Sequence, residues 1–222
     1  MMISKGCNEI FLRDRRAFSL VEVLIVTAIV AVLTGIVFPV VLSAKERGKK
    51  VVCLSNLHQI SRAITLYSVD DNDRFPYAVD GISYYFMRTM PLEIYFGTGN
   101  EDIPYALGAG RLEDTLRPYA RSLNIFGCPS EKPASWNNST SSLTFGPYGT
   151  NYTFLMRPFL RSWSTTQFQF PSNSPIGTEA HWYHQGTYFG DAFLNVAYAD
   201  QHVQYVQWLR YLGEQQQFAN YR

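Results

Sequence analysis

One run of the sequence constrains the fold more than any other. Residues 18–42 are apolar over about 25 positions, and Glu22 is the single charged residue among them. A helix of this length is long enough to cross the roughly 30 Å hydrocarbon core of a bilayer. Placing an ionised side chain in such a segment costs about 2.5–3.5 kcal/mol on insertion scales. We therefore expect Glu22 to have a cationic partner.

The residues around this run indicate its orientation. Lys5, Arg13, Arg15 and Arg16 precede it, which favours a cytoplasmic N-terminus and an exported C-terminal part. A secretory signal or a plain signal anchor also has a basic start and an apolar core, and small residues at positions 43–44 leave the first of these open.

The segment that begins at Arg15 resembles the N-terminus of type IV prepilins and of the pseudopilins of type II secretion systems. In that family a small residue, usually Gly, precedes the cleavage point; Phe follows, and Glu is the fifth residue of the mature protein. Ala17, Phe18 and Glu22 occupy these positions. The resemblance implies cleavage after Ala17 by a prepilin peptidase, N-methylation of Phe18, and pairing of Glu22 with a neighbouring subunit's terminus. Because Ala17 replaces the commoner Gly, we expect slower cleavage.

The long helix is expected to continue beyond the membrane. Apolar residues recur at steps of three and four from Val51 to Tyr67, which is the period of a helix with one buried face. Pro39 is expected to kink it. The polar residues 70–73 and Pro76 indicate its end. That polar cluster lacks the ligand spacing and glycine of a calcium loop, so a plain turn is favoured over a calcium site.

These patterns and the resemblance predict four parts. Residues 1–17 form a leader peptide, residues 18–42 a transmembrane and filament-core helix, residues 43–76 the outer half of the long helix and a turn, and residues 77–222 an exported globular pilin-like domain. The predicted fold class is α+β, with the long N-terminal membrane-spanning helix packed on a C-terminal antiparallel β-sheet domain.

Charge and cysteine content limit the possible partners. The chain has 19 basic and 18 acidic residues, and without residues 1–17 it has 15 and 16, so its bulk charge does not indicate a nucleic-acid partner. Cys7 lies in the leader. Cys53 and Cys128 lie on the oxidising side, where they could form a disulfide that closes a loop of about 75 residues. Two buried thiols are the alternative, because sequence does not show whether the two Cα atoms approach closely enough.

The last third of the chain has the pattern of strands and turns. Strands are expected at residues 148–154, 175–178 and 194–208, the last folded into a hairpin with a two-residue turn at Asp200-Gln201. Such a turn requires positive φ at both central residues, so Gln201 is expected to be modestly strained. Between residues 80 and 121 only residues 112–119 show helical spacing, for one or two turns.

Several downstream signatures resemble a large pilin-like group of planctomycete-type bacteria, whose chains end in a motif of His, nine residues and Asp-Gly. The matching segments are residues 53–60, 128–130, 148–152 and 197–203. Asp200 and His202 lie in the terminal motif. Gln201 replaces its Gly and Gly190 stands where its His belongs, so the resemblance implies the fold but no role for that histidine.

One cluster could support an enzyme. Glu179, His181 and His184 combine ligand types that suit zinc, but their spacing matches no motif with a known mechanism, and an aromatic-rich surface loop is favoured. The sequence contains no GxSxG, phosphate loop or CxxC motif. We therefore expect no catalytic residues, no cofactor and no enzymatic activity.

Three functions follow as hypotheses. The first is a structural subunit of a type IV pilus or type II secretion pseudopilus, with the prepilin peptidase/N-methyltransferase, other pilin or pseudopilin subunits and inner-membrane lipid as partners. Such a protein would be a single-pass protein of the bacterial inner membrane, with its C-terminal domain in the periplasm, or extracellular once assembled. A membrane-anchored binding protein for glycan or peptide and an exported metal-dependent hydrolase are the alternatives.

Overall fold

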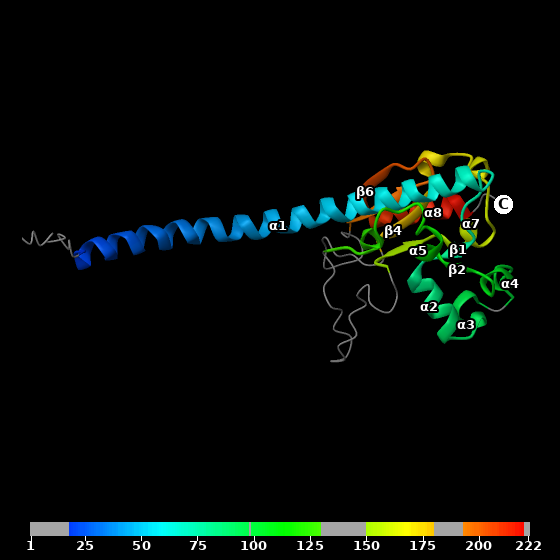
Figure 1. Cartoon of the computed structure of the whole chain (residues 1–222), viewed down its shortest axis with the longest axis horizontal. Coiled ribbons are helices and arrows are strands. Elements are labelled where there is room, and N and C mark those ends of the chain that lie inside the picture. Colours follow the sequence, from blue (N-terminus) through cyan, green and yellow to red (C-terminus); the bar gives the residue numbers. More distant parts are fainter. Residues whose placement is uncertain (1–17, 98, 130–149, 180–192, 220–222) are drawn as a thin grey trace, which may run out of the picture. The chain divides into compact units, whose positions relative to one another are not determined.

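The computed structural model describes residues 18–97, 99–129, 150–179 and 193–219 (Figure 1). The chain divides into two compact units, Met1–Ala44 and Lys45–Arg222. The long helix α1, Leu20–Asp70, contributes its apolar half to the first unit and its outer half to the second.

The first unit is an exposed apolar helix. Every residue from 18 to 44 is solvent-exposed, and the helix continues through Pro39 without interruption. The hydroxyls of Thr27, Thr34 and Ser43 donate to carbonyl groups three or four residues earlier, so these polar groups are satisfied within the helix. Among the described residues, α1 is the one helix long and apolar enough to cross a membrane.

The outer half of α1 buries one face in the second unit. Cys53, Leu57, Ile60 and Ile64 are at most 2% exposed and lie at the three- and four-residue steps that the sequence predicts. The helix extends to Asp70, three residues beyond the expected end. It stops there because the next residues turn left-handed: Asn72 and Asp73 have φ of 55° and 59°.

Four antiparallel strands form the main sheet, in the order β3-β4-β5-β6. The strands are β3 Tyr152–Phe154, β4 Pro175–Glu179, β5 Phe193–Tyr198 and β6 Val203–Gln207. Together with α1 they confirm the predicted α+β arrangement of a long N-terminal helix and an antiparallel sheet. The strand expected at residues 148–154 begins only at Tyr152; residues 148 and 149 lie outside the described part.

Helix α8, Trp208–Ala219, covers a face of this sheet that α1 does not. Successive residues of β5 alternate between the two faces. Ala197 belongs to the core cluster that contains the α1 side chains, whereas Leu194, Val196 and Tyr198 pack with Tyr211 of α8. The extension of the last strand to Trp208 was therefore wrong, because α8 begins at that residue directly after β6.

The β5–β6 turn also differs from the prediction. Ala197 pairs with Val203, the Tyr198 N–H donates to the His202 carbonyl at 3.0 Å, and the Gln201 N–H donates to the Tyr198 carbonyl at 2.9 Å. The loop therefore has three residues, 199–201, and the predicted two-residue turn is wrong. Three-residue loops end in a left-handed residue, and Gln201 alone in this loop has a positive φ, 77°.

A second, smaller lobe lies beside the sheet. Figure 1 shows α2, α3 and α4 grouped on the side of β1 and β2 away from α1. Its parallel strands pair Ala78 with Gly110, and its core includes Val79, Met87 and Leu160. The remaining elements are β1 Ala78–Val79, α2 Gly81–Thr89, α3 Leu92–Phe96, α4 Ile103–Ala106, β2 Gly110–Arg111, α5 Leu112–Thr115, η1 Leu123–Phe126, α7 Met156–Leu160, η2 Thr165–Gln167 and η3 Pro171–Asn173.

Candidate functional site

Glu22 caps the N-terminus of α1. Its Oε2 accepts a hydrogen bond from the Ser19 backbone N–H at 2.8 Å, and Ser19 is the residue before the first helical residue. This is the carboxylate half of a capping box, in which the third helical residue satisfies the N–H of the cap. The sequence prediction of a cationic partner missed this contact. The Ser-x-x-Glu spacing of residues 19–22 is the signal that predicts it.

The two residues expected at the processing site lie at the edge of the described part. Phe18 is 84% exposed, and Ala17 is outside the described residues. Phe18, Ser19 and Glu22 thus share one end of α1. A carboxylate there also interacts favourably with the positive end of the helix dipole.

Cys53 and Cys128 form a disulfide in the core of the second unit. Their Cα atoms are 5.1 Å apart, and the two residues are 0% and 4% exposed. Hydrogen bonds surround the bond: the Tyr152 hydroxyl donates to the Cys53 carbonyl at 3.1 Å, and the Cys128 N–H donates to Asn151 Oδ1 at 2.8 Å. Residues 53, 128 and 151–152, which belong to three of the segments that resemble the pilin-like group, therefore meet at this disulfide.

Glu179 lies against the same disulfide. One of its carboxylate oxygens and the two sulfurs fall within 4.8 Å of one another. The sulfurs are bonded to each other, so neither is a thiolate that could bind a metal ion. The carboxylate accepts hydrogen bonds from Asn195 N at 3.2 Å and Nδ2 at 2.8 Å. This trio fits a buried cross-link beside a hydrogen-bonded carboxylate, and it does not fit a metal centre. His181 and His184 lie outside the described residues.

The terminal-motif residues close the β5–β6 turn. Asp200 Oδ1 accepts from the His202 N–H at 3.2 Å and lies 2.5 Å from its Nδ1. The imidazole stacks on Tyr198, with ring centroids 4.2 Å apart. In this geometry both side chains fix the turn.

Two buried carboxylates support the smaller lobe. Asp80 Oδ1 accepts from the Ser83 N–H at 2.9 Å, which caps α2. Glu113 Oε1 accepts from the Gly81 N–H at 2.9 Å. Burial raises the pKa of the Glu113 carboxyl from 4.5 to about 7, because desolvation outweighs its hydrogen bonds and the nearby Arg111. Burial likewise raises the pKa of Asp80.

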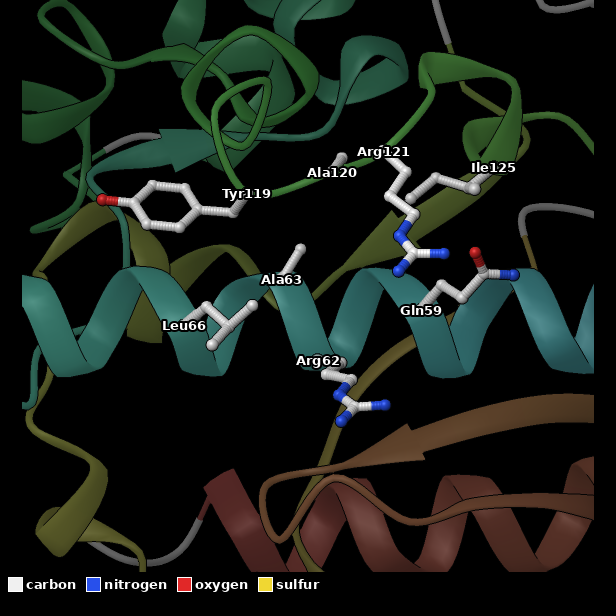
Figure 2. Close-up of a pocket in the computed structure, with 8 residues that line it drawn as sticks. All are labelled: Gln59, Arg62, Ala63, Leu66, Tyr119, Ala120, Arg121 and Ile125. Carbon is white, nitrogen blue, oxygen red and sulfur yellow. The ribbon is translucent and has the colours of Figure 1, made fainter.

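A pocket of about 440 Å³ opens between the outer half of α1 and the segment that follows α5 (Figure 2). In Figure 2 the Arg121 guanidinium reaches toward α1 near Gln59, and Arg62 projects from the next turn of the helix. Its lining residues are Gln59, Arg62, Ala63, Leu66, Tyr119, Ala120, Arg121 and Ile125. No local sequence pattern indicates this site, because residues 62 and 121 come to one pocket only through the fold.

Comparisons with known proteins agree with the geometry of α1. The family described as the prokaryotic N-terminal methylation motif matches residues 12–38. The type IV wide pilus major component PilA4 of Thermus thermophilus is 33% identical over 61 residues, which are 28% of this chain and 47% of that protein. The match thus spans about half the length of that pilin. No solved structure matches the chain significantly.

The motif and the pilin relative support a structural pilin or pseudopilin subunit with one membrane-anchoring helix. The chain thus carries the prepilin-type N-terminal methylation motif over residues 12–38 and is similar to a type IV pilin, on a pilin-like α+β arrangement.

Proposed function

We propose that this chain is the prepilin or pseudopilin of a type IV filament, cleaved after Ala17 and N-methylated on Phe18. Residues 18–42 anchor it in the bacterial inner membrane before assembly and pack with the same segment of other subunits afterwards. Residues 77–222 form the exported domain, and residues 43–76 connect the two. The prepilin peptidase/N-methyltransferase and other pilin or pseudopilin subunits are its partners.

The observation that carries this proposal is the exposed apolar half of α1 with Glu22 at its start. Large apolar side chains there, such as Leu20 and Ile36, are 79% and 65% exposed. Apolar surface of this extent requires lipid or partner helices around it. A carboxylate near the end of such a helix is costly in lipid, and the new amine of a neighbouring Phe18 would offset that cost.

The cap at Ser19 gives the test of Glu22 a matched control. Glu22→Ala removes both the charge and the hydrogen bond to Ser19. Glu22→Gln keeps an oxygen that accepts from the Ser19 N–H but carries no charge. If Glu22 pairs with a neighbour's amine, both variants insert into the membrane and both lose at least tenfold in filament incorporation, measured by immunoblot of sheared filaments. Normal incorporation of Glu22→Gln would leave Glu22 with the capping role only.

Processing is tested separately by mass spectrometry of the mature N-terminus. We expect an N-methylated Phe18 as the first residue. A mature chain that begins at Met1, or after Ala44, would contradict the proposed class of protein.

A further inference from the structure

Two surfaces of opposite charge lie on the second unit at different levels of α1. The basic groove is the pocket lined by Arg62, Arg121, Gln59 and their neighbours. The acidic turn comprises Asp70, Asp71 and Asp73, which follow the end of the same helix. Both surfaces lie within Lys45–Arg222, so their relation does not depend on the membrane half of the chain.

The basic groove has the chemistry of a carboxylate site. Arg62 and Arg121 are solvent-exposed, and no acidic side chain of the described residues forms an ion pair with either. Guanidinium groups bind carboxylates through paired N–H donors in a fixed fork, and the Gln59 amide adds another donor. A volume of about 440 Å³ accommodates a short acidic loop.

The acidic turn is held in a defined shape and presents its charge outward. Asp73 is exposed, and its N–H donates to the Ser68 carbonyl at 2.8 Å. The Tyr67 hydroxyl donates to Asp71 at 3.2 Å, and the Tyr67 ring packs edge-on against Tyr119 with centroids 5.6 Å apart. These contacts are neutral, and within the described part of the chain no cation pairs with the three carboxylates.

Within one chain the acidic turn follows the end of the groove formed by Leu66 and Tyr119, and Arg62 lies further back along α1. Arg62 and Asp70 are eight residues apart on α1, which corresponds to about 12 Å along the helix axis. A second copy that lies parallel and is shifted by about this distance brings its basic groove level with the acidic turn of the first. The contact uses two different surfaces, so it is heterologous, and a heterologous contact that does not close repeats as an open helical filament.

We propose that the basic groove at Arg62 and Arg121 binds the acidic turn, residues 70–73, of a second copy of this chain. The inference rests on the proposed filament function and names an exported contact for it. Charge complementarity selects the partner and fixes the axial offset between neighbours.

A charge swap tests the contact in the full chain assembled in its host. Arg62→Glu and Asp70→Lys each place like charges opposite one another, so each is expected to lower filament incorporation at least fivefold. The two changes combined restore opposite charges and return incorporation to within twofold of the wild type. A role of either residue in folding alone would not give this recovery, because the two losses would then accumulate.

Arg117→Glu is the matched control. This substitution changes the charge by the same amount as Arg62→Glu, at a residue that does not line the groove. The Arg117 Nη2 pairs with Asp114 at 3.0 Å on the surface. We expect it to incorporate within twofold of the wild type, because exposed pairs contribute little. Asp70→Asn, which removes the charge at nearly the same side-chain size, gives an intermediate loss if charge is the cause.

A second measurement locates the contact directly. A benzophenone side chain is placed at position 66, which lines the groove. In filaments it is expected to cross-link to a peptide that contains residues 70–73. Filaments mixed from isotopically heavy and light subunits show whether that peptide comes from a second copy. Filaments in which both single reversals incorporate normally, or in which the double variant does not recover, overturn this inference and leave the filament function intact. Absence of the wild-type chain from filaments refutes the proposed function itself.

Discussion

Removal of the Cys53–Cys128 disulfide is expected to cost a large part of the stability of the second unit. The bond joins residues separated by 75 positions. In the chain-entropy model, closing a loop of this length removes about 15 cal/mol/K from the unfolded state, or about 4.5 kcal/mol at 25 °C. Domains are stable by only about 5–15 kcal/mol in total. Cys53→Ala combined with Cys128→Ala should therefore approach the limit of stable folding.

The disulfide joins two segments of the second unit that are distant in sequence. Cys53 lies on the buried face of α1, and Cys128 follows η1, so the bond joins two segments that otherwise meet through packing and the bond from Asn56 Nδ2 to the Gly127 carbonyl at 2.8 Å. The hydrogen bonds of Asn151 and Tyr152 hold backbone groups beside both cysteines. These hydrogen bonds remain possible in the double variant. Its unfolded state, however, is no longer restricted by the cross-link and has a higher entropy.

Urea unfolding of the detergent-solubilised full chain measures this loss. Trp163 packs near Phe168, with ring centroids 6.0 Å apart, and provides the fluorescence signal. With a slope of about 2 kcal/mol/M, the midpoint should fall by about 2 M. Reductant should lower the midpoint of the wild type by a similar amount and leave that of the double variant unchanged. Midpoints that agree within about 0.3 M would refute the reasoning.

Three further changes test other contacts, each by the same urea midpoint. Gln201→Gly removes the backbone strain of a left-handed Gln, about 1 kcal/mol, but the added freedom of the unfolded chain costs about half as much. The free energy of unfolding should therefore rise by about 0.5 kcal/mol, and a decrease would contradict the left-handed conformation of residue 201. Gly177→Ala should cost about 1–3 kcal/mol, since its Cβ would lie 2.4 Å from the Phe154 ring; an unchanged midpoint would mean that the ring moves freely. Folding raises the pKa of Glu113 from 4.5 to about 7. Protonated Glu113 therefore contributes about 3 kcal/mol to the free energy of unfolding below pH 4.5, and this contribution is lost as the pH rises through 7. Glu113→Gln keeps an acceptor for Gly81 and should flatten this part of the pH profile; an unaltered slope would assign it to another group.

The parts of the fold that could be predicted are those with a local signal. Residues 51–67 repeat apolar side chains at helical spacing, and the same positions are buried on α1. Residues 194–198 and 203–206 are rich in apolar and aromatic side chains on either side of Asp200-Gln201, and they lie in β5 and β6. Such periodicity reports directly which face an element buries, without knowledge of what covers it.

The sequence predictions that were wrong or missing concern features that depend on contacts distant in sequence or on turn geometry. The start of α8 at Trp208 follows β6 without a breaker, so no residue type marks the change of period. The register Ala197–Val203, fixed by the whole hairpin, decides between a two- and a three-residue turn. Arg62 and Arg121 lie 59 positions apart, and only the packing of α1 against the segment after α5 brings both to one pocket.

The position of Cys53 has a mechanical consequence. Force applied along α1 from its N-terminal side reaches the second unit at the buried helix face, of which Cys53 is the first residue. From there a sulfur–sulfur bond transmits tension to Cys128 after η1, so α1 cannot slide out of its contact with this segment by moving apolar side chains alone. A pull on this helix therefore loads the domain through a bond whose rupture requires chemistry, whereas the packing around it yields reversibly.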